Sequence, residues 1–225
     1  GRYIMADRYG ISLGLAVPWE MTAREMARRV QTALDEKGTA GLATWVDLAE
    51  YEPRVTEPLT VRYRGADVHG CILPNGSLTS LQILNMLECF APVDDADPEY
   101  WHRLAEVLKP AWRDRLTYLT DPDFADVPVE RLLSKHYAAG RVERIRQFPG
   151  WVDDLPSQFP PGAMHGTLHH SAADAEGNVV SATITQGMAF GALFVAEGTG
   201  LILSHGMARF DPRSGRMNSV QAGKR

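Results

Sequence analysis

The sequence predicts an α+β fold, with helices and one hairpin up to about residue 150 and short antiparallel strands after it. Three observations predict this fold class. Apolar residues recur at helical spacing in several windows of the first part. Short alternating runs, separated by glycine-containing turns, follow in the second part. Residues 148–166, rich in proline, glycine and polar side chains, are expected to form an exposed connector between the two.

The first helix is expected over residues 22–37. Thr22 is its candidate N-cap, with Glu25 three positions later as in a capping box, and Gly38 ends it. Its apolar side is formed by Met26, Val30, Ala33 and Leu34. A second, short helix is expected around residues 47–51.

A β-hairpin and a buried helix come next. The alternating runs 59–64 and 67–73 predict two strands that turn at Gly65 and Ala66. Residues 80–90 are apolar nearly all round, which is typical of a helix enclosed by other elements.

A longer helix is expected from about Asp97 to Leu119, with a kink at Pro110. Its predicted apolar side consists of Leu104, Val107, Leu108, Trp112 and Leu116. One further helix is expected between residues 121 and 145, before the connector.

The strands after the connector form a second predicted hairpin. If residues 174–178 are the loop, Ala173 pairs with Val179 and Thr167 lies opposite Thr185. Alternate side chains of a strand point to opposite faces, so one face is polar and the other is expected to pack on a core. The polar face holds Thr167, His169, Ser171, Ser181, Thr183 and Thr185, and the apolar face Leu168, Ala172, Val180, Ala182 and Ile184. The pattern alone favours an ordinary hairpin with a threonine-rich solvent face.

Composition excludes several classes of protein. With 225 residues, of which 44% are hydrophobic, the chain is long enough for one sizeable core or two modest ones. A net charge of −5 with no basic stripe argues against nucleic acid as a partner and favours small molecules or proteins. No apolar run reaches the roughly 18 residues of a membrane span. The longest near the start, residues 11–19, is broken by Pro18 and is expected to be a strand or loop.

Neither targeting nor metal binding is indicated. No small-x-small cleavage site follows residues 11–19, so a signal peptide is not favoured, and a secreted or periplasmic and a cytoplasmic location both stay open. Cys71 and Cys89 lack metal spacing and are expected to be half-buried thiols. His165 and His169 have the i, i+4 spacing of a zinc site on a helix, but on a strand they do not converge.

Five motifs follow one another in the last part of the chain: residues 167–181 (TLHHSAADAEGNVVS), Phe190-Gly191, 198–203 (GTGLIL), Met207-x-x-Phe210 and 223–225 (GKR). Together they resemble the start of the small subunit of the gamma-glutamyltransferase (gamma-glutamyltranspeptidase) family. Upstream segments resemble that family's large subunit in the same order: 41–70, 84–90 and 113–128. The resemblance covers the chain from about Met26 onward.

The resemblance implies an N-terminal nucleophile hydrolase with a four-layer αββα sandwich, of which this chain is a partial segment. Such precursors cut themselves before a threonine, here at the Gly166–Thr167 bond. Residues 1–166 would then be the C-terminal part of the large subunit, and 167–225 the start of the small one. The new α-amino group would act as the base for the Thr167 hydroxyl, and Thr185 would orient that hydroxyl.

The implied function is that of a gamma-glutamyltransferase-like amide hydrolase or acyltransferase, working through an acyl-threonine intermediate. Its substrates would be γ-glutamyl compounds such as glutathione, or glutaryl-type amides. No cofactor and no metal are implied. The alternative is an inactive family member that keeps the fold as a binding or structural scaffold, in which the Gly166–Thr167 bond stays uncut.

Two positions depart from the family pattern. Gly187, preceded by Gln186, stands where an asparagine is usual, and Ala208 with Arg209 replaces an acidic pair that holds the substrate's ammonium. An arginine repels an ammonium and favours a carboxylate. We therefore expect acyl groups without the γ-glutamyl ammonium, as in the acylase-like branch of the family. A surface ion pair of Arg209 is the other interpretation.

Part of the family's machinery is expected outside the chain. The serine pair and the glycine pair of the oxyanion hole would follow Arg225, and an early substrate-binding arginine would precede Gly1. Oxyanion donors contribute about a hundredfold to a thousandfold in rate. The segment alone is therefore expected to be inactive or nearly so.

Overall fold

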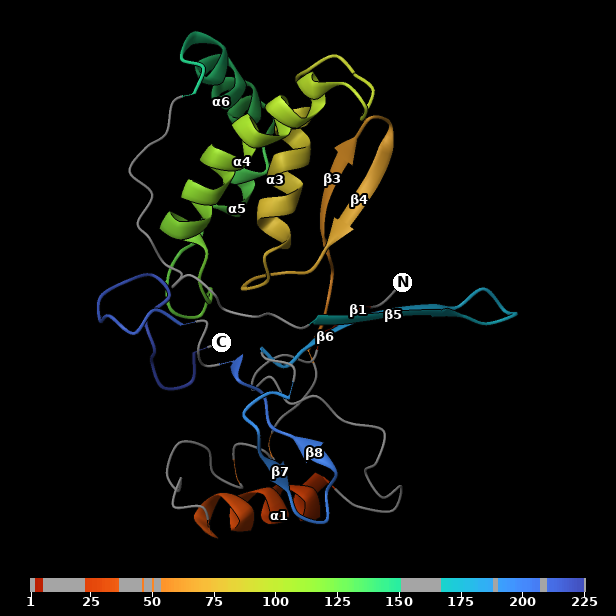
Figure 1. Ribbon diagram of the computed structural model, residues 1–225, viewed down its shortest axis with the longest axis vertical. Helices are drawn as coiled ribbons and strands as arrows, with labels where there is room; N and C mark the ends of the chain where they lie inside the picture. The colour runs from red at the N-terminus through yellow and green to blue at the C-terminus, as the bar shows by residue number, and fades with distance from the viewer. Residues whose placement is uncertain are drawn as a thin grey trace. The chain divides into compact units, whose positions relative to one another are not determined.

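The computed structural model describes residues 3–5, 23–36, 46, 50, 54–150, 167–187, 190–206 and 210–224. These residues form an α+β structure, as the sequence predicts (Figure 1). The chain divides into two compact units: the first consists of residues 1–5, 55–158 and 211–225, and the second of 6–54 and 159–210. Within the described ranges, no helix is both long and apolar enough for a transmembrane span.

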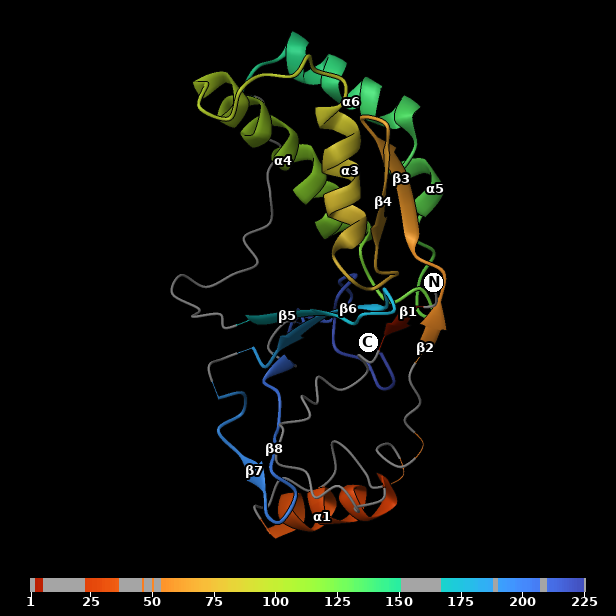
Figure 2. The same ribbon diagram turned by 90° about the vertical axis from the view of Figure 1, so that its right-hand side faces the viewer.

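The first unit contains four helices and a hairpin among its described residues. The helices are α3 (Ser77–Leu87), α4 (Pro98–Tyr118), α5 (Val129–Leu132) and α6 (Lys135–Gln147). The hairpin pairs β3 (Leu59–Tyr63) with β4 (Ala66–Gly70). In two perpendicular views, α3 lies between α4 and the hairpin (Figure 1, Figure 2), and it packs against both and against α6.

The β3–β4 hairpin turns one residue earlier than predicted. Tyr63 pairs with Ala66, so the two turn residues are Arg64 and Gly65. Both have positive φ, 49° and 88°, which is the requirement of a type I′ hairpin turn and explains the glycine. The prediction placed Ala66 in the turn, but alanine, unlike glycine, disfavours a positive φ. Ala66 is instead the first residue of β4.

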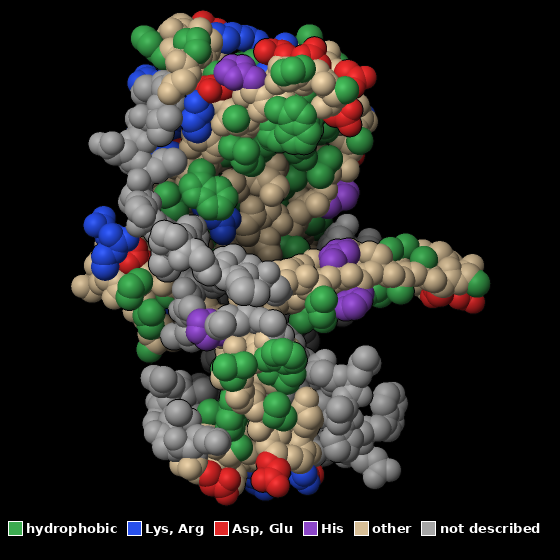
Figure 3. Space-filling view, viewed as in Figure 1, with side chains coloured by type: hydrophobic (Ala, Val, Ile, Leu, Met, Phe, Trp, Pro, Cys, Tyr) green, Lys and Arg blue, Asp and Glu red, His purple; other side chains and the backbone are tan. Residues whose placement is uncertain are grey.

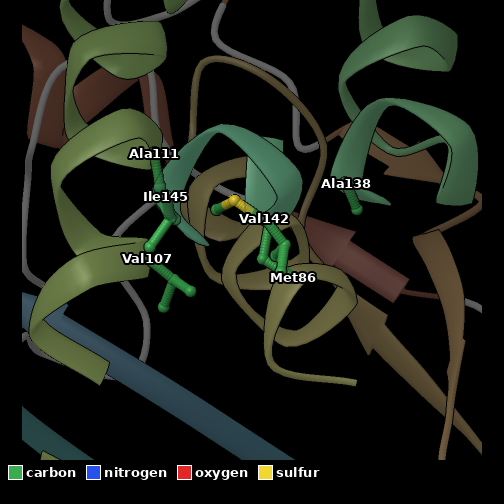
Figure 4. Close-up of a cluster of buried hydrophobic side chains, with 6 residues drawn as sticks. All are labelled: Met86, Val107, Ala111, Ala138, Val142 and Ile145. Atoms are coloured by element: carbon green, nitrogen blue, oxygen red, sulfur yellow. The ribbon is translucent and has the colours of Figure 1, made fainter. Parts of the chain in front are cut away.

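Helix α3 is buried, as predicted, and carries the centre of the core. Met86 is fully buried among residues of α4 and α6 (Figure 4). The buried members of this cluster are Met86, Val107, Ala111, Ala138, Val142 and Ile145. A second cluster in the same unit joins the hairpin side to α5 through Leu73, Leu78, Val127 and Leu132.

Helix α4 begins and ends where the sequence predicts, but its buried face differs. Asp97 caps it, accepting a hydrogen bond of 2.9 Å from the Glu99 amide. The predicted apolar residues Leu108 and Trp112 are 39% and 37% exposed. Val107 is buried and Leu104 packs against the same core, as predicted. The buried face also includes Glu106, Pro110, Ala111 and Asp114. The rest of the predicted face is wrong because charged residues were assigned to solvent, whereas Asp114 is buried among polar partners from α3 and α6.

Lys135 links three elements of this unit. Its ammonium donates to Asn85 Oδ1 at 2.7 Å, to the Arg62 carbonyl at 2.5 Å and to the Glu88 carboxylate. This contact with Lys135, followed by the hydrogen bond from the Arg64 amide, lowers the pKa of Glu88. The ends of β3, α3 and α6 are thereby joined.

The segment 211–224 packs on the loop after α4. The Thr120 hydroxyl donates to the Met217 carbonyl at 2.6 Å. Within the segment, the Asp211 carboxylate accepts two hydrogen bonds from the Arg213 guanidinium, at 2.9 and 2.7 Å, and one from the Arg213 amide at 3.0 Å. These contacts lower the pKa of Asp211 from its ordinary 3.8 to about 2.

This lowered pKa predicts a pH-dependent contribution to stability. A carboxyl whose pKa is depressed by folding stabilises the folded state above its unfolded pKa, and that contribution is lost as the pH falls through the folded value. Denaturant unfolding of the full-length protein should therefore show Asp211→Asn to be destabilising above about pH 4, with the difference from wild type vanishing toward about pH 2. Arg213→Ala should behave in the same way. A difference that persists undiminished at about pH 2 would contradict this assignment.

Among its described residues, the second unit contains one helix and two pairs of antiparallel strands. Helix α1 (Ala23–Glu36) packs against β7 (Val195–Ala196), which pairs with β8 (Leu201–Ile202). Val30 and Ala33 of α1 are buried with Ala196, as the helical spacing predicts. The hairpin of β5 (Thr167–Ala173) and β6 (Val179–Thr185) belongs to the same unit. Separately, β1 (Tyr3–Met5) pairs with β2 (Arg54–Thr56).

Several predictions fall wholly or mostly outside the described residues. They are the cap at Thr22, the side chain of Met26, the segment 11–19, most of the short helix at 47–51, and the connector from 151 to 166. Between residues 121 and 147 the structure has two helices, α5 and α6, where one was predicted. Cys89 is partly buried as expected, and burial raises the pKa of its thiol, whereas Cys71 is exposed.

Candidate functional site

The β5–β6 hairpin has the register that the sequence predicts. Ala173 pairs with Val179, and Thr167 pairs with Thr185 at the open end. Asp174 and Asn178 close the loop: the Asn178 amide and side chain donate to the Asp174 carboxylate at 2.8 and 2.6 Å, which lowers the pKa of Asp174. Gly177 in this loop has a φ of +86°, a conformation that favours glycine.

The two threonines at the open end are in contact. The Thr167 hydroxyl donates to Thr185 Oγ1 at 3.3 Å, and the Gly187 amide donates to the same oxygen, also at 3.3 Å. Both threonine side chains are exposed. Of the residues predicted for the site, Thr167 and Thr185 are thus brought together. Gly166 and Arg209 lie outside the described residues.

A row of hydrogen bonds continues along the same face. His169 lies opposite Thr183, and its Nδ1 is 2.7 Å from Thr183 Oγ1. Its Nε2 is 3.1 Å from Ser181 Oγ and 3.2 Å from Ser171 Oγ. Sequence reasoning placed these residues on one face but assigned His169 no role beyond a rejected metal site. Strand parity gives the shared face and the pairing of His169 with Thr183, but not the direction of the imidazole that makes the contacts with the serines.

The local backbone explains why position 187, one of the departures from the family pattern, is a glycine. Its φ is +83°, and an added Cβ would lie 3.1 Å from the His205 carbonyl oxygen. The His205 amide donates to the Gln186 carbonyl at 2.8 Å, which holds the two segments together. A residue with a side chain would therefore be strained and crowded here.

The apolar face of the hairpin is not covered by the described residues, contrary to the prediction that it packs on a core. Leu168, Val180 and Ile184 are 64%, 62% and 36% exposed. Hydrophobic side chains are visible on the surface of the hairpin (Figure 3). An isolated two-stranded hairpin is at best marginally stable in water, so this face needs further contacts.

The chemistry of the described site is that of hydroxyls and one imidazole. Among the described residues, no group of three or more His, Cys, Asp or Glu side chains is placed to hold a metal ion. A hydroxyl becomes a useful nucleophile only when a base takes its proton. Thr167, as the first residue of β5, would carry such a base in its own α-amino group if the preceding bond were cut.

Comparison with known proteins gives consistent results. Residues 21–225 match the family described as gamma-glutamyltranspeptidase. The chain is 39% identical over 233 aligned residues to the acylase ACY 1 proenzyme of Pseudomonas sp. (strain SE83), an alignment that covers all of this chain and 41% of that protein. It is 35% identical over 184 residues to the glutathione hydrolase proenzyme of Pseudomonas aeruginosa, covering 80% of this chain and 33% of the relative.

A solved structure shows the same likeness. The cephalosporin acylase from Bacillus halodurans superposes with a TM-score of 0.73 at 30% sequence identity, over 89% of this chain and 35% of that chain. The present chain thus spans well under half the length of these relatives. Because the family match extends over residues 21–225, nearly the whole chain, the chain belongs to the gamma-glutamyltranspeptidase family.

Proposed function

We propose that the full protein is a gamma-glutamyltranspeptidase-like amide hydrolase or acyltransferase with Thr167 as its nucleophile. The observation that carries this proposal is the Thr167–Thr185 hydroxyl contact of 3.3 Å at the first residue of β5. Self-cleavage at Gly166–Thr167 would divide the precursor into residues 1–166, the end of the large subunit, and 167–225, the start of the small one. The names of both Pseudomonas relatives, which call them proenzymes, support this division.

The reaction follows from the chemistry of an N-terminal threonine. The free α-amino group, with an ordinary pKa of about 7.7 to 8.0, accepts the proton of the Thr167 hydroxyl near neutral pH. Oγ1 attacks the amide carbonyl, the C–N bond breaks, and the amine leaves with a proton. Water or a second amine then attacks the acyl-threonine ester and restores the hydroxyl. Thr185 keeps the hydroxyl oriented between these steps.

The four-layer αββα arrangement is also part of the proposal. The likeness to the Bacillus halodurans acylase supports it, because 89% of this chain superposes on that structure. In such a sandwich, the exposed apolar face with Leu168, Val180 and Ile184 would pack on further layers of the full protein.

For the acyl group, we propose a chain with a terminal carboxylate and no ammonium, such as glutaryl. Arg209 stands where the family pattern has an acidic residue, and a guanidinium makes charge-assisted hydrogen bonds with a carboxylate. Two of the compared relatives are named acylases, which supports the same preference.

The test compares p-nitroanilides of three acyl groups on the processed full-length protein. Glutaryl-p-nitroanilide should be hydrolysed faster than the γ-glutamyl compound. Arg209→Ala should lower kcat/KM for the glutaryl substrate by about tenfold to a hundredfold, the effect of losing one hydrogen bond to a charged group. Hydrolysis of butyryl-p-nitroanilide, which has no carboxylate, should not change, and Arg209→Lys should be intermediate because it keeps the charge.

Two outcomes would contradict this proposal at different levels. Brisk γ-glutamyl hydrolysis with no glutaryl hydrolysis would refute the acyl preference and leave the amide hydrolase in place. No hydrolysis of any anilide, together with an uncut Gly166–Thr167 bond, would favour the inactive scaffold instead.

A further inference from the structure

His169 contacts three hydroxyl side chains of the polar face. Its Nδ1 contacts Thr183, and its Nε2 contacts both Ser171 and Ser181. One imidazole therefore bridges both strands and two successive cross-strand pairs. His170, the next residue, lies on the opposite face and pairs with Ala182.

His169 lies next to the two threonines along the polar face of the hairpin. Thr167–Thr185 is the terminal pair of the hairpin, and His169–Thr183 is the adjacent pair on the same face. Once the bond before Thr167 is cut, no residue precedes it to restrain the strand. Among the described residues, the side chains on this face are exposed, so burial does not fix their positions. The backbone pairing of β5 with β6 sets the register, and the cross-strand hydrogen bonds between side chains fix how these side chains lie.

We propose that His169 is a positioning residue: through Nδ1 and Thr183 it adds a side-chain link to the backbone pairing of β5 with β6 next to the open end, and so keeps the Thr167 hydroxyl on Thr185. The inference rests on the proposed function, in which Thr167 is the nucleophile. His169 itself does not touch the reacting atoms. A small misplacement of a reacting group costs up to about a hundredfold in rate. Loss of the Thr167–Thr185 contact should therefore lower the rate measurably.

The two ring nitrogens of His169 contact different residues, so substitutions can test them separately. Nδ1 contacts the opposite strand one pair away from Thr185, whereas Nε2 contacts the serines on the far side from Thr167. An asparagine places an amide near the position of Nδ1, and a glutamine places one near Nε2. If the Thr183 contact carries the positioning, asparagine should replace histidine better than glutamine does.

The kinetic test uses the full-length protein, with rates divided by the processed fraction from intact mass. His169→Ala should lower kcat about tenfold or more while KM changes less than about twofold, since orientation of the nucleophile and not substrate binding is lost. His169→Asn should recover most of kcat, and His169→Gln should recover less. His170→Ala, the matched control on the opposite face, should leave both constants unchanged.

A double-mutant cycle with Thr183→Val isolates the contact. If the two residues act as a unit, the double variant should be no slower than the slower single variant. Additive losses would refute the coupling. A rise in KM with kcat unchanged, or equal loss in the alanine and asparagine variants, would also overturn the proposal.

A structural measurement keeps this inference separate from the proposed function. In crystals of the full-length His169→Ala protein, the Thr167–Thr185 hydroxyl separation should exceed the 3.3 Å of the native pair and leave hydrogen-bond range. A pair that stays at its native separation would refute the positioning role even if no amide substrate were ever hydrolysed. Lost activity in Thr167→Ala alone, by contrast, addresses only the nucleophile.

Discussion

Replacing Thr167 by alanine in the full-length protein is expected to abolish both self-cleavage and amide hydrolysis. The substitution removes the hydroxyl that lies 3.3 Å from Thr185 Oγ1 and leaves the hairpin's backbone pairing intact. Loss of a catalytic nucleophile costs about a thousandfold in rate or more. Intact-mass spectrometry should show two fragments for the wild type, the second beginning at Thr167, and a single precursor for the variant.

Two further variants show whether the effect belongs to this hydroxyl. Thr167→Ser keeps a hydroxyl and should still yield the fragment, at a reduced rate. Thr117→Ala removes an exposed threonine of α4 and should leave cleavage and turnover unchanged. A fragment with the same mass boundary in Thr167→Ala would disprove the assignment, as would full activity of an uncut wild type.

The register of the β5–β6 hairpin could be predicted because it depends on local rules only. The side-chain period of a strand is two, and residues 174–178 offer an obvious loop, so counting outward places Thr167 opposite Thr185. The same counting places His169 opposite Thr183. What the sequence could not supply was the direction of the imidazole, which contacts hydroxyls on both strands.

The buried face of α4 could not be predicted from periodicity because it depends on distant residues. Asp114 receives hydrogen bonds from Gln82 and Arg141, which lie on α3 and α6. A charged residue is buried only when such partners surround it, and a helical pattern carries no information about them. Gly187 is a similar case, since the need for glycine arises from the backbone of His205.

The Asp114 network is expected to give the largest stability effect in the first unit. Asp114 Oδ2 accepts from Gln82 Nε2 at 2.5 Å and from the Tyr137 hydroxyl at 2.8 Å, and Oδ1 accepts from Arg141 Nη2 at 3.0 Å. Burial, and next the hydrogen bond to Asp114, raises the pKa of Tyr137, so this phenol stays protonated and remains a donor. One buried carboxylate thus satisfies donors from two other helices.

Asp114→Ala should therefore destabilise the protein by about 3 to 5 kcal/mol, because it leaves a partly buried guanidinium and two further donors without their acceptor. Urea unfolding of the uncut Thr167→Ala protein, followed by tryptophan fluorescence, measures the change in the free energy of unfolding on a single chain. Trp112 lies on the same helix and serves as a nearby reporter.

Asp114→Asn should lose less stability than Asp114→Ala, since its amide oxygen still accepts a hydrogen bond. Asp126→Ala, at an exposed position, should stay within about 0.5 kcal/mol of the parent. If Asp114→Ala cost no more than Asp126→Ala, the network would be incidental to stability, and packing of Met86 and Val107 alone would hold α4 in place.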